Sequence, residues 1–171
     1  SIDGFTHTLH PRIGDSDHGG MLIWIKERIN VSLEFWKSVE GCMEGRADSE
    51  RNWLLITSEA CKLAICSAYM RVNKPVQSEY YKQNKDLYAL LTVEEDILKE
   101  KGYSAIFLAD FNAHSGTSNR FKFSNSLHQQ NNNGKLLTHW AENQDLRCLN
   151  TEIWTNGCQD KPTYHKTIGD R

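Results

Sequence analysis

The chain has 171 residues, of which 39% are hydrophobic and 25% are charged, and its formal net charge at pH 7 is −2. This length allows one domain with a true hydrophobic core, and this composition excludes a chain that is disordered throughout. The overall charge does not indicate nucleic-acid binding, although a local positive cleft needs no net positive charge. The apolar runs, such as residues 105–109, are far too short to span a bilayer, so we expect no membrane association.

The first residues and the cysteines bear on where the protein functions. No secretory signal precedes the first apolar run and the chain does not begin with Met, so we expect a piece of a longer polypeptide. The cysteines are odd in number and form no Cys-x-x-Cys pattern. We interpret them as reduced, buried thiols of an intracellular protein rather than as a disulfide framework or a zinc site. They are Cys42, Cys61, Cys66, Cys148 and Cys158.

The first half of the chain predicts strands separated by irregular segments. Residues 1–18 are polar with turn signals, and residues 41–52 are rich in Gly, Asp, Glu and Arg, so both are predicted to lack regular structure. The strands are short and apolar, with β-branched, aromatic or alternating residues. The last two strands are predicted to pair as a hairpin. The predicted strands cover residues 21–25, 31–36, 53–57 and 62–69.

The second half of the chain predicts helices that alternate with strands, which indicates an α/β fold. Residues 78–101 carry apolar side chains at three- and four-residue intervals, which predicts one long amphipathic helix ended by Gly102. Thr92 and Glu95 have the spacing of a capping box, so a break and restart of this helix near Thr92 is an alternative. The remaining predicted elements are a strand that leads from residue 103 to Asp110, a long polar loop at 117–132, a helix at 134–143 and a strand at 146–150.

The segment that follows Leu108 is the most informative stretch of the chain. An apolar, β-rich run ends here in Asp110, Asn112 and His114. Many α/β enzymes place a carboxylate and a carboxamide in this way at the carboxyl end of a buried strand. Asp110 and Asn112 lie two residues apart, so on an extended backbone their side chains would point to the same side. The structural alternative is that Asp110 caps a turn and Asn112 adopts the left-handed conformation, both common at strand ends.

Several stretches, in the right order, resemble the endonuclease/exonuclease/phosphatase superfamily (DNase I-like), and most closely the endonuclease domain of non-LTR (LINE-type) retrotransposons. Residues 110–116 resemble the signature motif, and residues 63–69 resemble the strand that ends in the active-site tyrosine. The resemblance covers most of the chain and implies an α/β, four-layer sandwich in which helices flank two packed, mainly antiparallel sheets. It also implies that residues 1–171 form a single partial domain, incomplete at both ends. The other matching stretches are residues 19–25, 133–137, 146–150 and 162–164.

The resemblance assigns catalytic roles to three residues. It implies that Asp110 orients and helps to deprotonate the attacking water and holds the divalent metal, and that Asn112 supports it. It implies that the phenol of Tyr69 hydrogen-bonds the phosphate. The structural alternative for Tyr69 is an aromatic side chain half-buried at a sheet edge.

Other residues are candidates for substrate binding. Arg71 stands where the family usually has Pro, and its cation would help to hold a phosphate; Ala109 stands where the family usually has Gly. Asn150 would organise hydrogen bonds in the site and Thr163 would line the pocket, with a turn residue and a strand residue as the respective structural alternatives. His114 is interpreted as a loop residue near the site rather than as the catalytic base.

The implied function is metal-dependent phosphodiester hydrolysis with Mg²⁺ (or Mn²⁺), as a DNA endonuclease that nicks the target site of a retrotransposon. The implied partners are DNA and a reverse transcriptase domain in the same full-length polypeptide, and the implied location is nuclear. The family's metal-binding Glu and Ser-Asp-His motif have no counterpart in the chain, so we expect little activity from the chain alone, because such residues act as a unit. The alternatives are a catalytically inactive, transposon-derived binding or scaffold domain, and a phosphatase of the same superfamily.

Overall fold

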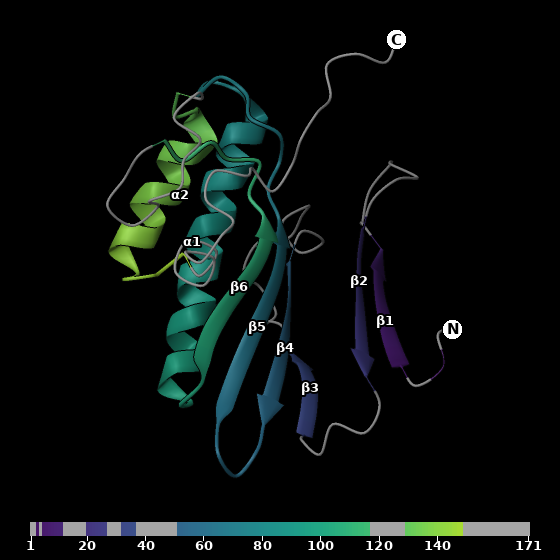
Figure 1. Cartoon of the computed structure of the whole chain (residues 1–171). Helices are drawn as coiled ribbons and strands as arrows, with labels where there is room; N and C mark the ends of the chain where they lie inside the picture. The colour runs from purple at the N-terminus through teal and green to yellow at the C-terminus, as the bar shows by residue number, and fades with distance from the viewer. Residues whose placement is uncertain are drawn as a thin grey trace, which may run out of the picture.

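A four-stranded mixed sheet, two helices and a separate pair of antiparallel strands make up the described part of the chain (Figure 1). The computed structural model describes residues 3, 5–11, 20–26, 32–36, 51–116 and 129–148. The fold is mixed α/β, and neither described helix is both long and apolar enough to cross a membrane. The elements are β1 (Phe5–Pro11), β2 (Gly20–Lys26), β3 (Ser32–Trp36), β4 (Arg51–Thr57), β5 (Lys62–Tyr69), α1 (Glu79–Glu100), β6 (Ser104–Asp110) and α2 (Asn132–Asn143).

The sheet has the order β3-β4-β5-β6, and within it only the last pair is parallel. β4 and β5 are antiparallel and are joined by a short turn in which Ser58 N donates to Cys61 O over 2.9 Å, which confirms the predicted hairpin. α1 connects β5 to β6, because two parallel neighbours need a crossover of this kind. The crossover brings the carboxyl ends of β5 and β6 to one edge of the sheet, the carboxyl edge.

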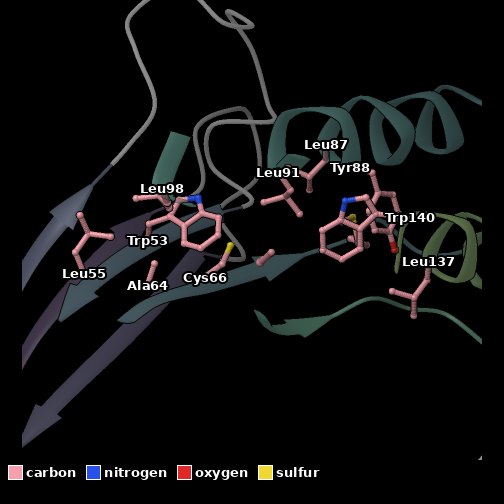
Figure 2. Close-up of a cluster of buried hydrophobic side chains, with 12 residues drawn as sticks. Trp53, Leu55, Ala64, Cys66, Leu87, Tyr88, Leu91, Leu98, Leu137 and Trp140 are labelled. Atoms are coloured by element: carbon pink, nitrogen blue, oxygen red, sulfur yellow. The ribbon is translucent and has the colours of Figure 1, made fainter. Parts of the chain in front are cut away.

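Both helices cover the same face of the sheet, and the hydrophobic core lies between helices and sheet (Figure 1, Figure 2). Side chains alternate along β5, so that Ala64, Cys66 and Ala68 are buried towards the helices. The indole of Trp140 on α2 packs edge-on against Phe107 of β6, with ring centroids 4.8 Å apart. The α1 side chains in this core are Leu87, Tyr88, Leu91 and Leu98.

α1 is one uninterrupted helix, so a break near Thr92 does not occur. The helix begins after Ser78, whose side chain accepts a hydrogen bond from Tyr81 N, and it ends ahead of Gly102, whose φ of +82° favours glycine. The Thr92 hydroxyl does not cap a new helix. It donates to the carbonyl oxygen of Tyr88, one turn earlier, over 3.0 Å.

A buried ion pair lies where the sequence predicts a loop. Arg51 on β4 donates to both carboxylate oxygens of Glu94 on α1, with distances of 2.7 Å from Nε and 2.6 Å from Nη2. The indole of Trp53 donates to the same carboxylate over 2.8 Å. Arg51 is 1% exposed and Glu94 is fully buried. The ion pair allows the charged side chain of Arg51 to be buried as part of a strand. β4 therefore begins at Arg51, and the prediction of a loop through residue 52 is wrong.

Some other segments differ from the sequence-based prediction. Residues 5–11 were expected to be irregular but form β1, because they pair in antiparallel register with β2. Residues 146–148 do not belong to a strand, so the predicted strand does not begin there. The last two residues of that predicted strand, at 149–150, and most of the two predicted loops, at 41–50 and 117–128, lie outside the described residues.

Candidate functional site

Tyr69 and Asp110 lie side by side at the carboxyl edge. They are register partners at the last positions of β5 and β6, and a 2.9 Å hydrogen bond from Met70 N to Asp110 O continues the pairing. The preceding pair, Ala68 and Ala109, packs on the helix side, so this pair points away from the helices. Tyr69 is half-buried and Asp110 is exposed. The structure therefore brings together two of the predicted site residues from distant parts of the chain.

Asp110 and Asn112 form a tight turn directly after β6. The Oδ1 atom of Asp110 accepts a hydrogen bond from Asn112 N over 3.0 Å, and Asn112 has a φ of +45°, in the left-handed region. The side-chain amide of Asn112 turns back and donates to Met70 O over 2.8 Å. Asn112 thus lies beyond the strand and its backbone is not extended. The prediction that the side chains of Asp110 and Asn112 point to the same side, which assumed an extended backbone, therefore does not apply. The capped turn that the sequence offered as the structural alternative is present.

The carboxylate of Asp110 keeps one oxygen available in spite of this turn. Within the described part of the chain, its only hydrogen bond is the one that Oδ1 accepts. Oδ2 of an exposed carboxylate is a suitable ligand for Mg²⁺, which prefers oxygen, so Asp110 fits the role of one metal ligand. Among the described residues, no three His, Cys, Asp or Glu side chains are grouped to hold a metal. Mg²⁺ usually completes its shell with water and substrate phosphate.

Arg71 adds a cation next to this edge. Its guanidinium carbon lies 5.8 Å from the ring centroid of Tyr80, in the first turn of α1. Its backbone is held by Asn84: Arg71 N donates to Asn84 Oδ1 over 2.7 Å, and Arg71 O accepts from Asn84 Nδ2 over 3.0 Å. Arg71, a half-buried residue, thus holds its guanidinium against an aromatic ring, two residues beyond Tyr69.

A buried pair of asparagine side chains holds the loops at this edge, and the sequence reasoning did not identify it. Asn84 of α1 and Asn133 of α2 are each 1% exposed, and Nδ2 of Asn84 donates to Oδ1 of Asn133 over 3.0 Å. One signal for this pair was present in the sequence. Asn84 falls between Tyr81 and Tyr88 on the apolar stripe of α1, at three- and four-residue spacing. A polar side chain in such a stripe has to find buried partners.

The loop that follows Asp110 docks onto the N-terminus of α2. Asn131 caps this helix: its Oδ1 accepts hydrogen bonds from Gly134 N over 2.7 Å and from His114 N over 3.1 Å. Asn131 N in turn donates to His114 O over 3.2 Å. A Cβ on Gly134 would overlap the carbonyl oxygen of His114, so this close approach requires glycine. His114 is exposed in a loop beside the site, where the sequence places it.

Two side chains of the hydrophobic core have raised pKa values. Burial raises the pKa of the Cys66 thiol, the charge of Glu94 raises it further and that of Arg51 opposes this. Burial also raises the pKa of Tyr88. Both side chains lie on the helix side of the sheet, so we attribute these shifts to packing. The other two predicted site residues, Asn150 and Thr163, lie outside the described residues.

Comparisons with known protein families, with curated proteins and with solved structures found no match. The carboxyl edge combines an exposed carboxylate (Asp110), a phenol (Tyr69) and a guanidinium (Arg71). A carboxylate can orient water or hold a cation, and a phenol and a guanidinium can both donate to phosphate oxygens.

Proposed function

We propose that this chain is the core of a Mg²⁺-dependent phosphodiesterase of the endonuclease/exonuclease/phosphatase superfamily, and that it cleaves DNA as the endonuclease domains of non-LTR retrotransposons do. The observation that supports this best is the register pairing of Tyr69 with Asp110. The resemblance assigns both residues to one active site, although their motifs are far apart in the sequence. The carboxyl ends of strands in α/β sheets are also where ligands commonly bind.

The chemistry follows from the groups at this edge. Asp110 would accept a proton from the attacking water as the new phosphorus–oxygen bond forms, and the bond from phosphorus to the leaving strand oxygen would break, with that oxygen taking a proton from solvent. Asp110 would also be one ligand of Mg²⁺, which, when bound, would stabilise the negative charge of the phosphate. The hydroxyl of Tyr69 donates to a phosphate oxygen, and Arg71 neutralises part of its charge. The amide of Asn112 donates to Met70 O, so its contribution is to fix the turn that presents Asp110. The roles of Asn150 and Thr163 in substrate binding remain predictions from the sequence.

We also propose that the four-stranded sheet is one half of a DNase I-like four-layer sandwich. Its face away from the helices carries large apolar side chains on every strand, among them Leu33, Leu54, Ile65 and Leu108, which is typical of a sheet that packs on a second sheet. β1 and β2 lie on this side in Figure 1 and would belong to that second sheet. The exposed large hydrophobic side chains on this face of the sheet are Leu33 (37%), Phe35 (37%) and Leu108 (61%).

A second function, a binding or scaffold domain without catalysis, is favoured by one observation. The hydrogen bonds of Asp110 and Asn112 with their neighbours are those of a capped turn, which needs no catalytic role. In this case the same edge, with Arg71, would bind nucleic acid as an anion without cleaving it.

A nicking assay on the full-length protein tests the first proposal. Asp110→Ala should slow Mg²⁺-dependent nicking of supercoiled DNA by about 10²- to 10⁴-fold, since it removes the proton acceptor. The fold of the variant should stay intact, because Asp110 is exposed and its side chain contributes only the hydrogen bond of the turn, about 1 kcal/mol. Asn112→Ala should have a milder effect, because a neutral hydrogen bond contributes less than a charge-assisted one. His114→Ala should have little effect. Asp96→Ala is the matched control, an exposed carboxylate near the end of α1 that lies away from the carboxyl edge.

The outcomes separate the candidate functions. Equal nicking by the Asp110→Ala and Asp96→Ala variants would refute the endonuclease. Asp110-dependent hydrolysis of a phosphomonoester, with plasmid DNA left intact, would indicate a phosphatase. Salt-sensitive DNA binding without either activity would indicate the binding domain.

A further inference from the structure

We infer that Asn133 is a positioning residue of the proposed phosphodiesterase, and that it holds the two loops of the active site in one fixed geometry. This inference rests on the proposed function. Tyr69 and Arg71 belong to the segment that follows or ends β5, whereas Asp110 and Asn112 end or follow β6. These groups act on one phosphate only if the two segments keep a constant separation.

Asn133 bridges the two segments directly. Its Nδ2 donates to Arg71 O over 2.8 Å and to Asn112 O over 3.1 Å, so both hydrogens of one amide are shared between the two loops. Its backbone N donates to Asn73 Oδ1 over 3.1 Å, which ties α2 further to the segment after β5. Asn133 is 1% exposed, so water does not compete for these bonds.

Asn84 completes the bridge from the other helix. Its Oδ1 accepts from Arg71 N over 2.7 Å, and its Nδ2 donates to Arg71 O over 3.0 Å and to Asn133 Oδ1 over 3.0 Å. The oxygen and nitrogen of both amides therefore have partners, as a buried polar network requires. The network fixes the backbone of Arg71 on both its N–H and its C=O, and it orients Asn133 towards Asn112.

This arrangement serves positioning better than packing. An apolar side chain would fill the same space at the junction of α1 and α2, but it would leave the partly buried Asn112 O without this donor and Arg71 O with Asn84 Nδ2 alone. The amide instead fixes the distance between two backbone carbonyls, one on each loop. A displacement of about 1 Å in a reacting group can slow an enzyme by about 10²-fold. Loss of the bridge should therefore affect kcat more than the KM for DNA.

The chain supplies a matched control for the test. Asn132 is the preceding residue on α2, and its Nδ2 donates to Lys74 O over 2.9 Å, farther along the segment after β5. Its removal leaves the donors to Arg71 O and Asn112 O in place. In the full-length protein, Asn133→Ala should lower the kcat of Mg²⁺-dependent plasmid nicking by about 10- to 100-fold with little change in KM. Asn132→Ala should retain wild-type kcat. Asn84→Ala, which leaves both donors of Asn133 in place, should have an intermediate effect.

Hydrogen exchange tests the bridge without reference to activity. The backbone amides of Arg71 and Asn112 donate to Asn84 Oδ1 and Asp110 Oδ1, while Asn133 holds the carbonyls of the same two residues. Loss of the bridge in the Asn133→Ala variant should loosen both loops, so these amides should exchange about tenfold faster or more, while those in the middle of α1 keep their protection. Unchanged exchange at both amides, or an equal kcat for the Asn133→Ala and Asn132→Ala variants, would overturn the inference. If Asn133→Ala does not fold, Asn84→Ala tests the bridge at Asn112, on which Asn84 acts through Asn133 Oδ1. Wild-type exchange of the Asn112 amide together with wild-type kcat in that variant would overturn the inference. If the wild-type protein does not cleave DNA, the proposed function fails, and faster exchange in the Asn133→Ala variant still supports the bridge.

Discussion

Replacing Arg51 by Met should destabilise the fold by about 3–5 kcal/mol, because it removes the guanidinium from a deeply buried ion pair. Arg51 is 1% exposed and its bonds of 2.7 and 2.6 Å to Glu94 are bidentate and charge-assisted. Glu94 would then keep a hydrogen bond from Trp53 but lose both hydrogen bonds and the positive charge that Arg51 supplies. Uptake of a proton by Glu94 would limit the loss, so the range is an upper bound.

A double-mutant cycle separates the interaction energy of the Arg51–Glu94 pair from the free energy lost through packing alone. Glu94→Gln alone should destabilise to a similar extent, because it leaves the guanidinium beside a neutral amide. The double variant Arg51→Met/Glu94→Gln buries no charge, and the Gln carbonyl can still accept from Trp53. We expect it to be less destabilised than either single variant, whereas independent effects would add to about 6–10 kcal/mol.

Urea unfolding followed by tryptophan fluorescence measures all four proteins, and constant m-values would show that the compactness of the native and unfolded states is unchanged. Lys85→Met is the control, because it removes a cation from an exposed position on α1 and should change the free energy of unfolding by less than about 0.5 kcal/mol. Additive effects of Arg51→Met and Glu94→Gln, or a loss below about 1 kcal/mol for either, would refute an energetic role for the pair.

Two further predictions concern the helix that supports the site and the alkaline limit of stability. Gly134→Ala should lower the free energy of unfolding, measured in urea, by about 1–3 kcal/mol, because the added Cβ overlaps His114 O, although alanine normally favours a helix. Lys135→Ala, at an exposed position on the same turn, should leave the free energy of unfolding unchanged. A Gly134→Ala variant more stable than the wild type would contradict the reasoning. The raised pKa of Cys66 predicts stability that is complete below the ordinary thiol pKa of 9.0 and falls at higher pH, towards the folded-state pKa, by up to about 1.4 kcal/mol per pH unit. Urea titrations should show a shallower alkaline decline in Cys66→Ala; an identical slope would argue against this origin. Tyr88 should add to the decline only above the ordinary tyrosine pKa of 10.0.

The elements that the sequence predicts well are those determined by local signals. Helix α1 lies within one residue of its predicted bounds, since its apolar spacing, the Ser78 cap and Gly102 are all close in the chain. β5 matches its predicted range of residues 62–69, because apolar residues recur along this stretch and the polar residues and Pro75 follow only after it. The predicted capping box at Thr92 was a local signal too, but the Thr92 hydroxyl also accepts a hydrogen bond from Trp140 on α2, a contact that no window of sequence contains.

What the sequence did not predict depends on partners far along the chain. Arg51 looked like part of a polar loop because its counterion, Glu94, is on a helix 43 residues later. The strand at residues 5–11 is polar and acquires its structure only through its register with β2. The hydrogen bond between Asn84 and Asn133 joins two helices, and neither asparagine identifies the other as its partner in the sequence. The sequence could place Tyr69 and Asp110 at strand ends, but only the parallel register makes them neighbours.

The structural and the catalytic interpretations of Asp110 are compatible, because they use different atoms of the carboxylate. Oδ1 accepts the hydrogen bond from Asn112 N that closes the turn, and this bond fixes the side-chain torsions. Oδ2 is then presented in one direction on an exposed edge, beside Tyr69. A group that must accept a proton from water gains from such preorganisation, since no reorientation is needed during the reaction. The capped turn, the amide of Asn112 on Met70 O and the bridge through Asn133 are therefore the features we would expect around a carboxylate that acts on one defined phosphate.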